Sequence, residues 1–154
     1  MNETTHRFMA AGSVAADPKG LALLSAMTAA EIWASASPAQ ARGFYMAVGR
    51  RLAAAQPMDE ATDLALLAAR ANMLWAALDW GHVDLHMEDQ GIAIRHEGLP
   101  HALDGDVDGH WREIVSSVLE GVYDAWFRAL GSGATLMTRT VDFNGGTLDL
   151  WHGH

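Results

Sequence analysis

Apolar residues follow a helical period over roughly the first half of the chain. Asp17-Pro18 is a helix start, because aspartate can cap the first turn and proline fits the first helical position. A helix from there to about Ala34 has one apolar stripe, formed by Leu21, Leu24, Thr28 and Ile32. Ser37-Pro38 repeats the start signal, and this second helix must stop before Pro57. Its predicted buried stripe is Phe44, Tyr45, Val48 and Leu52.

A third helix is predicted from Asp59 to Trp80-Gly81, where the glycine ends it. The residues that keep helical spacing are Leu64, Leu67, Ala68, Ala71, Trp75 and Leu78. Alanine is abundant in all three helices, and small side chains let helix axes approach closely. We therefore expect intimate helix packing, either within the chain or between chains.

The period then changes to the alternation of β-strands. Val83 to Met87 and Ile92 to Glu97 alternate on either side of a polar cluster, Glu88-Asp89-Gln90-Gly91. Because Gly91 can adopt positive φ without cost, we predict a β-hairpin with its turn in this cluster. A second hairpin is predicted near the end of the chain, with alternating segments from Thr135 to His152 around Asn144-Gly145.

Between the two hairpins the chain offers an acidic loop and a fourth helix. The loop from Asp104 to Gly109 has the spacing of a calcium-binding EF-hand only in part, since the final glutamate and the preceding helix are missing. We interpret it as a solvated acidic turn in which Asp108 caps the helix. Gly131 or Gly133 should end that helix. Its wide apolar face consists of Trp111, Ile114, Val115, Val118, Val122 and Trp126, and its polar side of Glu113, Ser117, Glu120, Asp124 and Arg128.

This order of elements predicts an α+β fold. It has N-terminal helices and two β-hairpins that form an antiparallel sheet of about four strands, with one helix between the hairpins. We predict an irregular N-terminal arm at residues 1–16 and a single α+β domain at 17–154.

Composition narrows the classes of function. The chain has 154 residues, no cysteine and a formal charge of -9 with only ten lysines and arginines. Thiol catalysis and thiolate zinc sites are therefore excluded, and a nucleic-acid partner is disfavoured because binding phosphates requires clustered positive charge. No export signal or membrane-spanning run is recognisable, so we expect a cytoplasmic protein near the inner membrane, with a periplasmic location as the alternative.

Histidines on the first predicted strand are the candidates for metal or acid-base chemistry. His82, Asp84 and His86 share one face by strand alternation, and His96 or His152 from neighbouring strands could add a ligand. Alternation on a half-exposed sheet explains the same polar residues without any metal, and we favour this interpretation. No phosphate loop, nucleophile motif or convergent carboxylate pair is apparent. We therefore predict no catalytic residue, no metal and no cofactor.

Tryptophans are the candidates for sugar binding, because the apolar faces of sugar rings stack on indole rings. Trp75, Trp111 and Trp126 lie on apolar helical stripes and are expected in the core. Trp33 and Trp151 are the freer ones. Trp151 lies opposite the face of Leu148 and Leu150, so it is either a surface platform or part of a subunit interface.

The chain resembles the D subunit of the bacterial cellulose synthase operon, with agreement that is best from about Met58 to Asp142. The residues that carry the resemblance form blocks in the right order and spacing: Leu78-Asp79-Trp80-Gly81-His82-Val83-Asp84-Leu85, Glu88-Asp89-Gln90, Ile94-Arg95-His96-Glu97-Gly98-Leu99-Pro100, Trp111, Val118-Leu119-Glu120-Gly121-Val122-Tyr123-Asp124-Ala125-Trp126 and Thr138-Arg139-Thr140-Val141-Asp142.

This resemblance implies a non-catalytic accessory protein that assembles as a homo-octamer of four dimers, beside the other cellulose synthase complex proteins. Nascent β-1,4-glucan chains are then expected to pass through internal passages of the ring on their way to export and crystallisation. By position in the family, glucan contact falls on the arm residues Asn2, Thr4, Thr5, His6, Arg7 and Phe8. A disordered tail is the alternative for the arm. The alternative for the whole chain is a metal-dependent hydrolase that uses His82, Asp84, His86 and His96.

Overall fold

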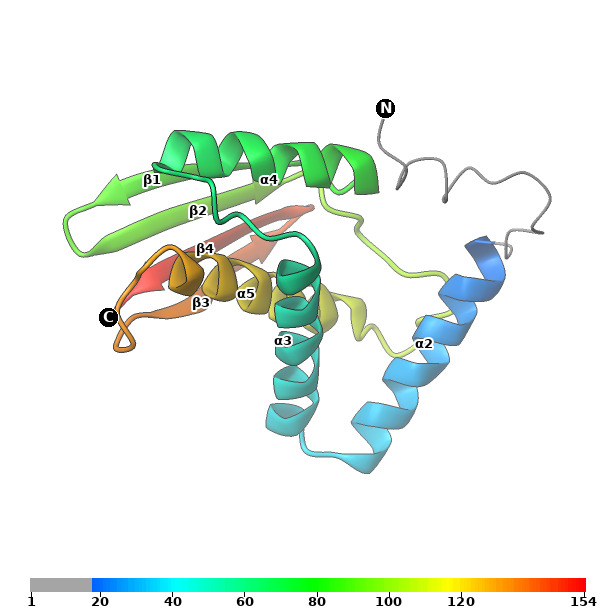
Figure 1. Ribbon diagram of the computed structural model, residues 1–154. Helices are drawn as coiled ribbons and strands as arrows, with labels where there is room; N and C mark the ends of the chain where they lie inside the picture. Colours follow the sequence, from blue (N-terminus) through cyan, green and yellow to red (C-terminus); the bar gives the residue numbers. More distant parts are fainter. Residues whose placement is uncertain (1–17) are drawn as a thin grey trace.

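The computed structural model of the protein describes residues 18–154. This part of the chain forms four helices and four strands, which confirm the α+β class and the order of elements. Figure 1 shows their arrangement. The helices are α2 Pro18–Ser35, α3 Pro38–Ala55, α4 Leu64–Leu78 and α5 Trp111–Ala129. The strands are β1 His82–Glu88, β2 Gly91–Glu97, β3 Met137–Asn144 and β4 Thr147–Gly153.

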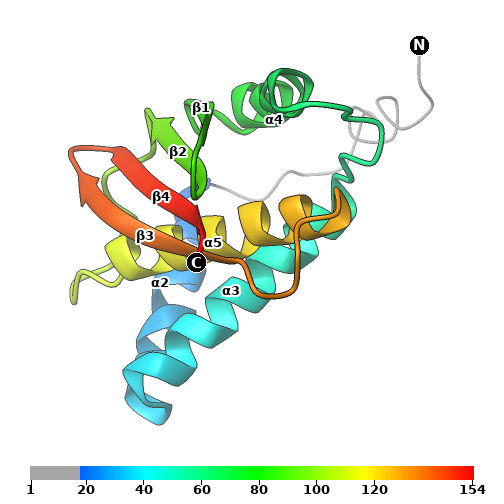
Figure 2. The same cartoon turned by 90° about the vertical axis from the view of Figure 1, so that its left-hand side faces the viewer.

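The two hairpins join into one antiparallel sheet with the strand order β1-β2-β4-β3. In Figure 2, α4 and α5 lie on one side of this sheet, and no element within residues 18–154 covers the other side. We call the first side the helical face and the second the open face. Strand alternation divides the side chains between them, so that Val83, Ile94 and Leu150 are buried on the helical face.

Three large aromatic rings form the centre of the core between the sheet and its helices. The ring of Trp75 on α4 lies 6.2 Å from that of Tyr123 and 5.7 Å from that of Trp126, both on α5. All three are at most 1% exposed. Trp111 is half-buried and donates a hydrogen bond from its indole Nε1 to the carbonyl of Pro100. The core positions predicted for Trp75 and Trp126 are therefore confirmed.

Helices α3 and α5 cross at two glycines. A side chain at Gly49 would collide with the backbone at Val118, and one at Gly121 would collide with the backbone at Met46. Each glycine thus lets the opposite backbone approach closely. The expected close packing of helices is present here, and at the crossing itself glycine rather than alanine allows it.

The predicted stripes of the first two helices are wrong in part. On α3, Phe44 and Val48 are 48% and 38% exposed. The buried positions of α3 follow a strict spacing of four: Ala41, Tyr45, Gly49 and Ala53. On α2, Leu21 and Leu24 are exposed and Ile32 is half-buried against the core, while the buried residues are Ala26 and Ala29. On α3, the backbone of α5 comes too close for any side chain at Gly49.

Helix α4 is shorter than predicted and begins at Leu64. The carboxylate of Asp63 accepts a hydrogen bond from the backbone N–H of Leu66, which makes Asp63 the cap in place of Asp59. At the other end Asp79 is in the left-handed conformation, with φ of 55°.

The start of helix α5 also differs from the prediction. Asp106, and not Asp108, accepts hydrogen bonds from the backbone N–H groups of His110 and Trp111 at this end of the helix.

Both hairpin turns differ in detail from the prediction. In the first, Glu88 pairs with Gly91, which leaves Asp89-Gln90 as the turn, and Gly91 does not have positive φ. A side chain at Gly91 would instead collide with β4. In the second, Asn144 pairs with Thr147, and the turn is Gly145-Gly146 with φ of 57° and 83°. Two successive residues at positive φ are typical of the tight turn that suits a hairpin.

Candidate functional site

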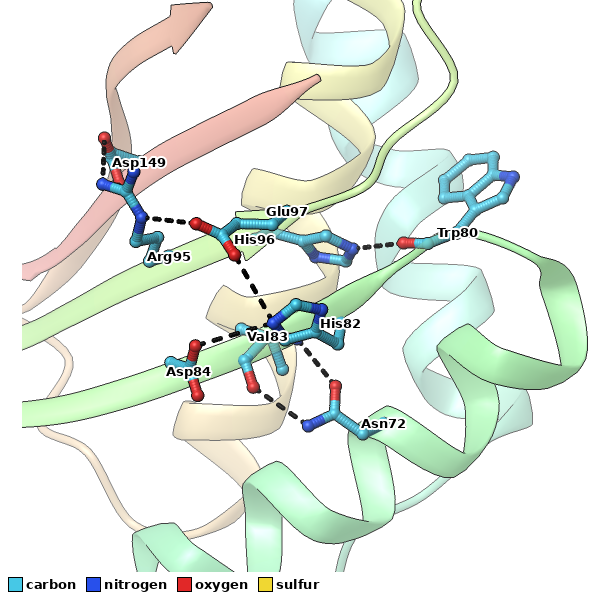
Figure 3. Close-up of polar contacts among 9 residues, drawn as sticks. All are labelled: Asn72, Trp80, His82, Val83, Asp84, Arg95, His96, Glu97 and Asp149. Carbon is cyan, nitrogen blue, oxygen red and sulfur yellow. Dashed lines mark hydrogen bonds and ion pairs between the residues drawn. The ribbon is translucent and has the colours of Figure 1, made fainter. Parts of the chain in front are cut away.

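Two of the polar side chains predicted on β1, His82 and Asp84, lie together on the open face of the sheet (Figure 3). His82 Nε2 is 3.5 Å from Glu97 Oε2 on β2 and 3.8 Å from Asp84 Oδ2 on its own strand. Arg95 extends the group to a third strand, because its Nε donates to Glu97 Oε1 at 2.9 Å and its Nη1 lies 3.3 Å from Asp149 Oδ1. We call these five residues the ion-paired cluster.

The electrostatics of the ion-paired cluster are those of an exchangeable surface network. The hydrogen bond from Arg95 lowers the pKa of the Glu97 carboxyl, and the same bond raises the pKa of Arg95. Side-chain exposures run from 34% for Asp149 to 55% for His82. Exposed ion pairs of this kind contribute little to stability.

His96 lies on the opposite face, which contradicts its predicted part in a cluster with His82. The register pairs His96 with Val83, so its ring points to the helical face, where it is fully buried. The ring Nε2 lies 2.6 Å from the carbonyl oxygen of Trp80, and Nδ1 lies 2.7 Å from the hydroxyl of Tyr123. Because a carbonyl only accepts, Nε2 carries the proton and Nδ1 accepts from the tyrosine. Burial lowers the pKa of His96 to about 4, so the ring is neutral at physiological pH.

His152 is the second histidine that the structure removes from the predicted cluster. It pairs with Ile92 and is fully buried on the helical face. Its Nδ1 lies 2.8 Å from the hydroxyl of Thr138, which donates to Asp124 Oδ1 at 3.1 Å. The carboxylate of Asp124 also accepts from Arg128 Nε at 2.7 Å. Since the Thr138 hydrogen goes to Asp124, Nδ1 of His152 carries the proton, and burial lowers the pKa of its ring.

These positions remove the convergence on which the metal hypothesis depended. His82, Asp84 and His86 share the open face as predicted, while both proposed additional ligands point to the other side. Within residues 18–154 no group of three or more histidine or acidic side chains is arranged to hold a metal ion. His96 and Glu97 are neighbours in the chain, but they lie on opposite faces and cannot act as a base and its orienting carboxylate.

Asn72 is a structural residue that the sequence analysis missed. Its side-chain amide donates to the carbonyl of Val83 at 2.9 Å and accepts from the N–H of the same residue at 2.7 Å (Figure 3). One side chain of α4 thus satisfies both backbone groups at the free edge of β1. Covering an edge strand in this way prevents further strand pairing at that position.

A polar hollow of about 400 Å³ is lined by residues of α5 and β3. Here Glu120 accepts hydrogen bonds from both the N–H and the hydroxyl of Thr140, at 2.9 and 2.6 Å. Arg42 on α3 lies 4.0 Å from Glu113, at the limit of an ion pair. The wall of this hollow therefore serves first to join α5 to the sheet.

The remaining candidates differ in how accessible they are. The ring of Trp33 is not free, because it stacks between Tyr45 at 5.5 Å and His110 at 4.6 Å. Trp151 does lie opposite Leu148 and Leu150, half-buried on the open face. The predicted glucan-binding residues fall outside the described part of the chain: Asn2, Thr4, Thr5, His6, Arg7 and Phe8.

Comparison with known proteins gives one consistent result. Residues 4–152 match the family model for the D subunit of cellulose synthase. One cellulose synthase operon protein D from Komagataeibacter xylinus is 38% identical over 81 residues, which are 49% of this chain and 50% of that protein. Two further proteins of that name, from Komagataeibacter xylinus and Komagataeibacter sucrofermentans, are each 33% identical over 100 residues, 62% of either chain. The chain thus spans between half and two thirds of the length of these relatives.

Proposed function

Because the chain belongs to the family of cellulose synthase D subunits, we propose that it is a non-catalytic accessory protein of bacterial cellulose biosynthesis. The observation that carries this proposal is the extent of the family match, which begins within the N-terminal arm and reaches into the last strand. On this proposal the protein acts with the cellulose synthase complex proteins and guides nascent β-1,4-glucan chains toward export and crystallisation.

The arrangement of the histidines supports a non-catalytic role over the metal-dependent hydrolase. His96 and His152 are held neutral in separate buried networks, and each bonds to a residue that joins the sheet to helix α5. His82 and His86 on the open face are exposed, and His82 lies beside the surface carboxylates of Asp84 and Glu97. A hydrolase that used His82, Asp84, His86 and His96 together would need ligands from both faces of the sheet at once.

Large apolar side chains exposed on α2 and α3 support assembly into a homo-oligomer. They are Leu21, Leu23, Leu24 and Met27 on α2, and Phe44 and Val48 on α3, with exposures of 38–64%. Exposed apolar side chains gathered on two neighbouring helices are typical of interfaces between proteins. We propose that this apolar surface is covered by other copies of the chain in an octamer of four dimers, the assembly that the family resemblance implies.

The proposed location is the cytoplasm near the inner membrane, with the periplasm as the alternative. None of the helices described within residues 18–154 combines the length and apolarity that crossing a bilayer requires. Cell fractionation of a strain that carries the tagged chain distinguishes the two compartments.

The native mass in solution tests the assembly. We expect the mass of an octamer by light scattering, and a much smaller species for Leu24→Glu, because the substitution places a charge in the apolar surface of α2. Ala69→Glu is the matched control, since Ala69 is exposed on α4, outside this surface. A monomeric wild-type protein, or equal dissociation of both variants, contradicts the proposed interface.

The function itself is tested in cellulose-producing cells. We expect that deletion of residues 2–8, the proposed glucan contact, leaves the native mass unchanged but lowers the crystalline order of the cellulose, measured by X-ray diffraction of the product. Unchanged cellulose after deletion of the whole gene contradicts the proposed role. Unchanged cellulose after deletion of the arm alone contradicts only the site.

A further inference from the structure

The open face of the sheet has two ends with different properties. At one end the side chains of the ion-paired cluster satisfy one another. At the other end the side chains of Glu88, Asp89, Gln90 and Arg139 make no hydrogen bond or ion pair with any residue between 18 and 154. The strand register brings the ends of all four strands together here, because Glu88 pairs with Gly91, Gly91 with Gly153 and Gly153 with Met137.

Trp151 lies in the middle of this unpaired end. It is flanked in register by Ala93 on β2 and Arg139 on β3. Its indole ring lies along the sheet over two glycines, since a side chain at Gly91 would come within 2.8 Å of the ring and one at Gly153 would collide with it. Trp151 is half-buried, and its indole N–H donates to no acceptor within residues 18–154. A flat aromatic surface is thus held in place with its polar atom unused.

The turn of the first hairpin borders the indole ring. Glu88, Asp89, Gln90 and Trp151 line a shallow hollow of about 500 Å³, which is within the range of small-ligand sites. The carboxylates only accept hydrogen bonds, the amide of Gln90 both donates and accepts, and the indole of Trp151 donates. Arg139, the register partner of Trp151 on β3, adds a donor beside the hollow. The hollow therefore offers an apolar platform with donors and acceptors at its edge.

This combination selects a neutral, polyhydroxylated ligand. A sugar ring has an apolar face that can stack on indole and hydroxyl groups at its rim that both donate and accept. An anion would be repelled by Glu88 and Asp89, and Arg139 beside the ring disfavours a cation. An apolar partner would leave all four polar side chains desolvated without bonds.

We propose that the hollow at Trp151 binds a glucan chain and is a contact separate from the N-terminal arm. The identification of the sugar as β-1,4-glucan rests on the proposed function. The site lies on the open face of the sheet, which no described element covers, so a polymer can lie across the platform without threading through the domain (Figure 2).

Affinity electrophoresis of the full-length protein in native gels that contain soluble hydroxyethyl cellulose tests this site. We expect the dissociation constant of Trp151→Ala to rise about tenfold, the equivalent of one lost stacking contact, while Trp151→Phe keeps most of the affinity. Gln90→Ala and Arg139→Ala should weaken binding by smaller factors. Because both side chains are exposed, misfolding would not explain a loss of binding. Asp84→Ala, in the ion-paired cluster, is the matched control and should bind as the wild type does.

Two outcomes overturn the site. If Trp151→Ala migrates as the wild type does while deletion of residues 2–8 abolishes retardation, glucan binds only at the arm. If Trp151→Ala changes the native mass, the platform is an interface between copies of the chain. Neither outcome affects the proposed role in cellulose ordering, which the diffraction experiment in cells tests separately.

Discussion

His82 and His96 belong to the two strands of one hairpin, yet they lie on opposite faces of the sheet. His96 is fully buried and bonded through both ring nitrogens, whereas the side chain of His82 is 55% exposed and lies within 4 Å of two surface carboxylates, those of Asp84 and Glu97. The same residue type is thus a structural link on one face and a solvated polar group on the other. The comparison shows that the environment, and not the number of histidines, decides what they do.

Polar groups on the helical face hold the sheet and helix α5 together at three places. His96 connects β2 to Tyr123, and on β3 Thr138 donates to Asp124 and Thr140 to Glu120 on the same helix. The fully buried side chains of Leu148 and Leu150 add apolar contact beside these links. Buried polar groups that are fully bonded fix one relative position of two elements more strictly than apolar packing does.

The largest effect is expected from a substitution that removes the link formed by His96 on the helical face. His96→Ala leaves the hydroxyl of Tyr123 and the carbonyl of Trp80 without partners and creates a cavity, so we expect a loss of about 3 kcal/mol or more in the free energy of unfolding. Urea denaturation followed by circular dichroism measures it. A loss below about 1 kcal/mol would mean that water replaces the ring and that the link is not structural.

The second largest expected effect is a loss of stability on acidification, which acts through the same residue, His96. The unfolded ring takes up a proton near its ordinary pKa of 6.5, while the folded ring does so only near 4. The unfolded state therefore binds more protons between these values, and stability falls as pH decreases from 6.5 to 4, by about 3 kcal/mol from this group. Below pH 4 both states are protonated and this contribution no longer changes.

The variant His96→Gln separates this contribution from that of the other titrating groups. Glutamine can both donate and accept but does not titrate, so the decrease in unfolding free energy between pH 6.5 and 4 should become shallower than in the wild type. Urea midpoints at several pH values measure the slope. Parallel slopes for the two proteins would show that His96 is not the group responsible.

Much of this difference between faces could be read from the sequence. In β2, His96 has the same parity as Ile92 and Ile94, and in β4, His152 has the same parity as Leu148 and Leu150. Alternation within each strand therefore already placed both histidines with the apolar residues. The metal hypothesis failed because it combined histidines from neighbouring strands without applying this test to each strand.

Other features could not be read in the same way. The stripes predicted for α2 and α3 followed the large apolar residues, while most of the buried positions are alanine, with glycine where the backbones of α3 and α5 cross. Glycine does not contribute to a hydrophobic periodicity, so the pattern could not predict the crossing at Gly49 and Gly121. The joining of the hairpins through β2 and β4 depends on long-range packing, which local patterns do not contain.

The smallest effect is expected from substitutions of the histidines on the open face. His82→Ala removes a ring whose two carboxylate neighbours, Asp84 and Glu97, stay exposed, and Glu97 keeps its bond to Arg95. We expect the free energy of unfolding to change by less than about 0.5 kcal/mol, with the native mass unchanged. His86→Ala, in which no partner within residues 18–154 is lost, serves as the matched variant on the same strand. If either substitution abolished cellulose ordering in cells while stability and assembly were kept, the open face of β1 would carry function after all, and the solvated interpretation of these histidines would be wrong.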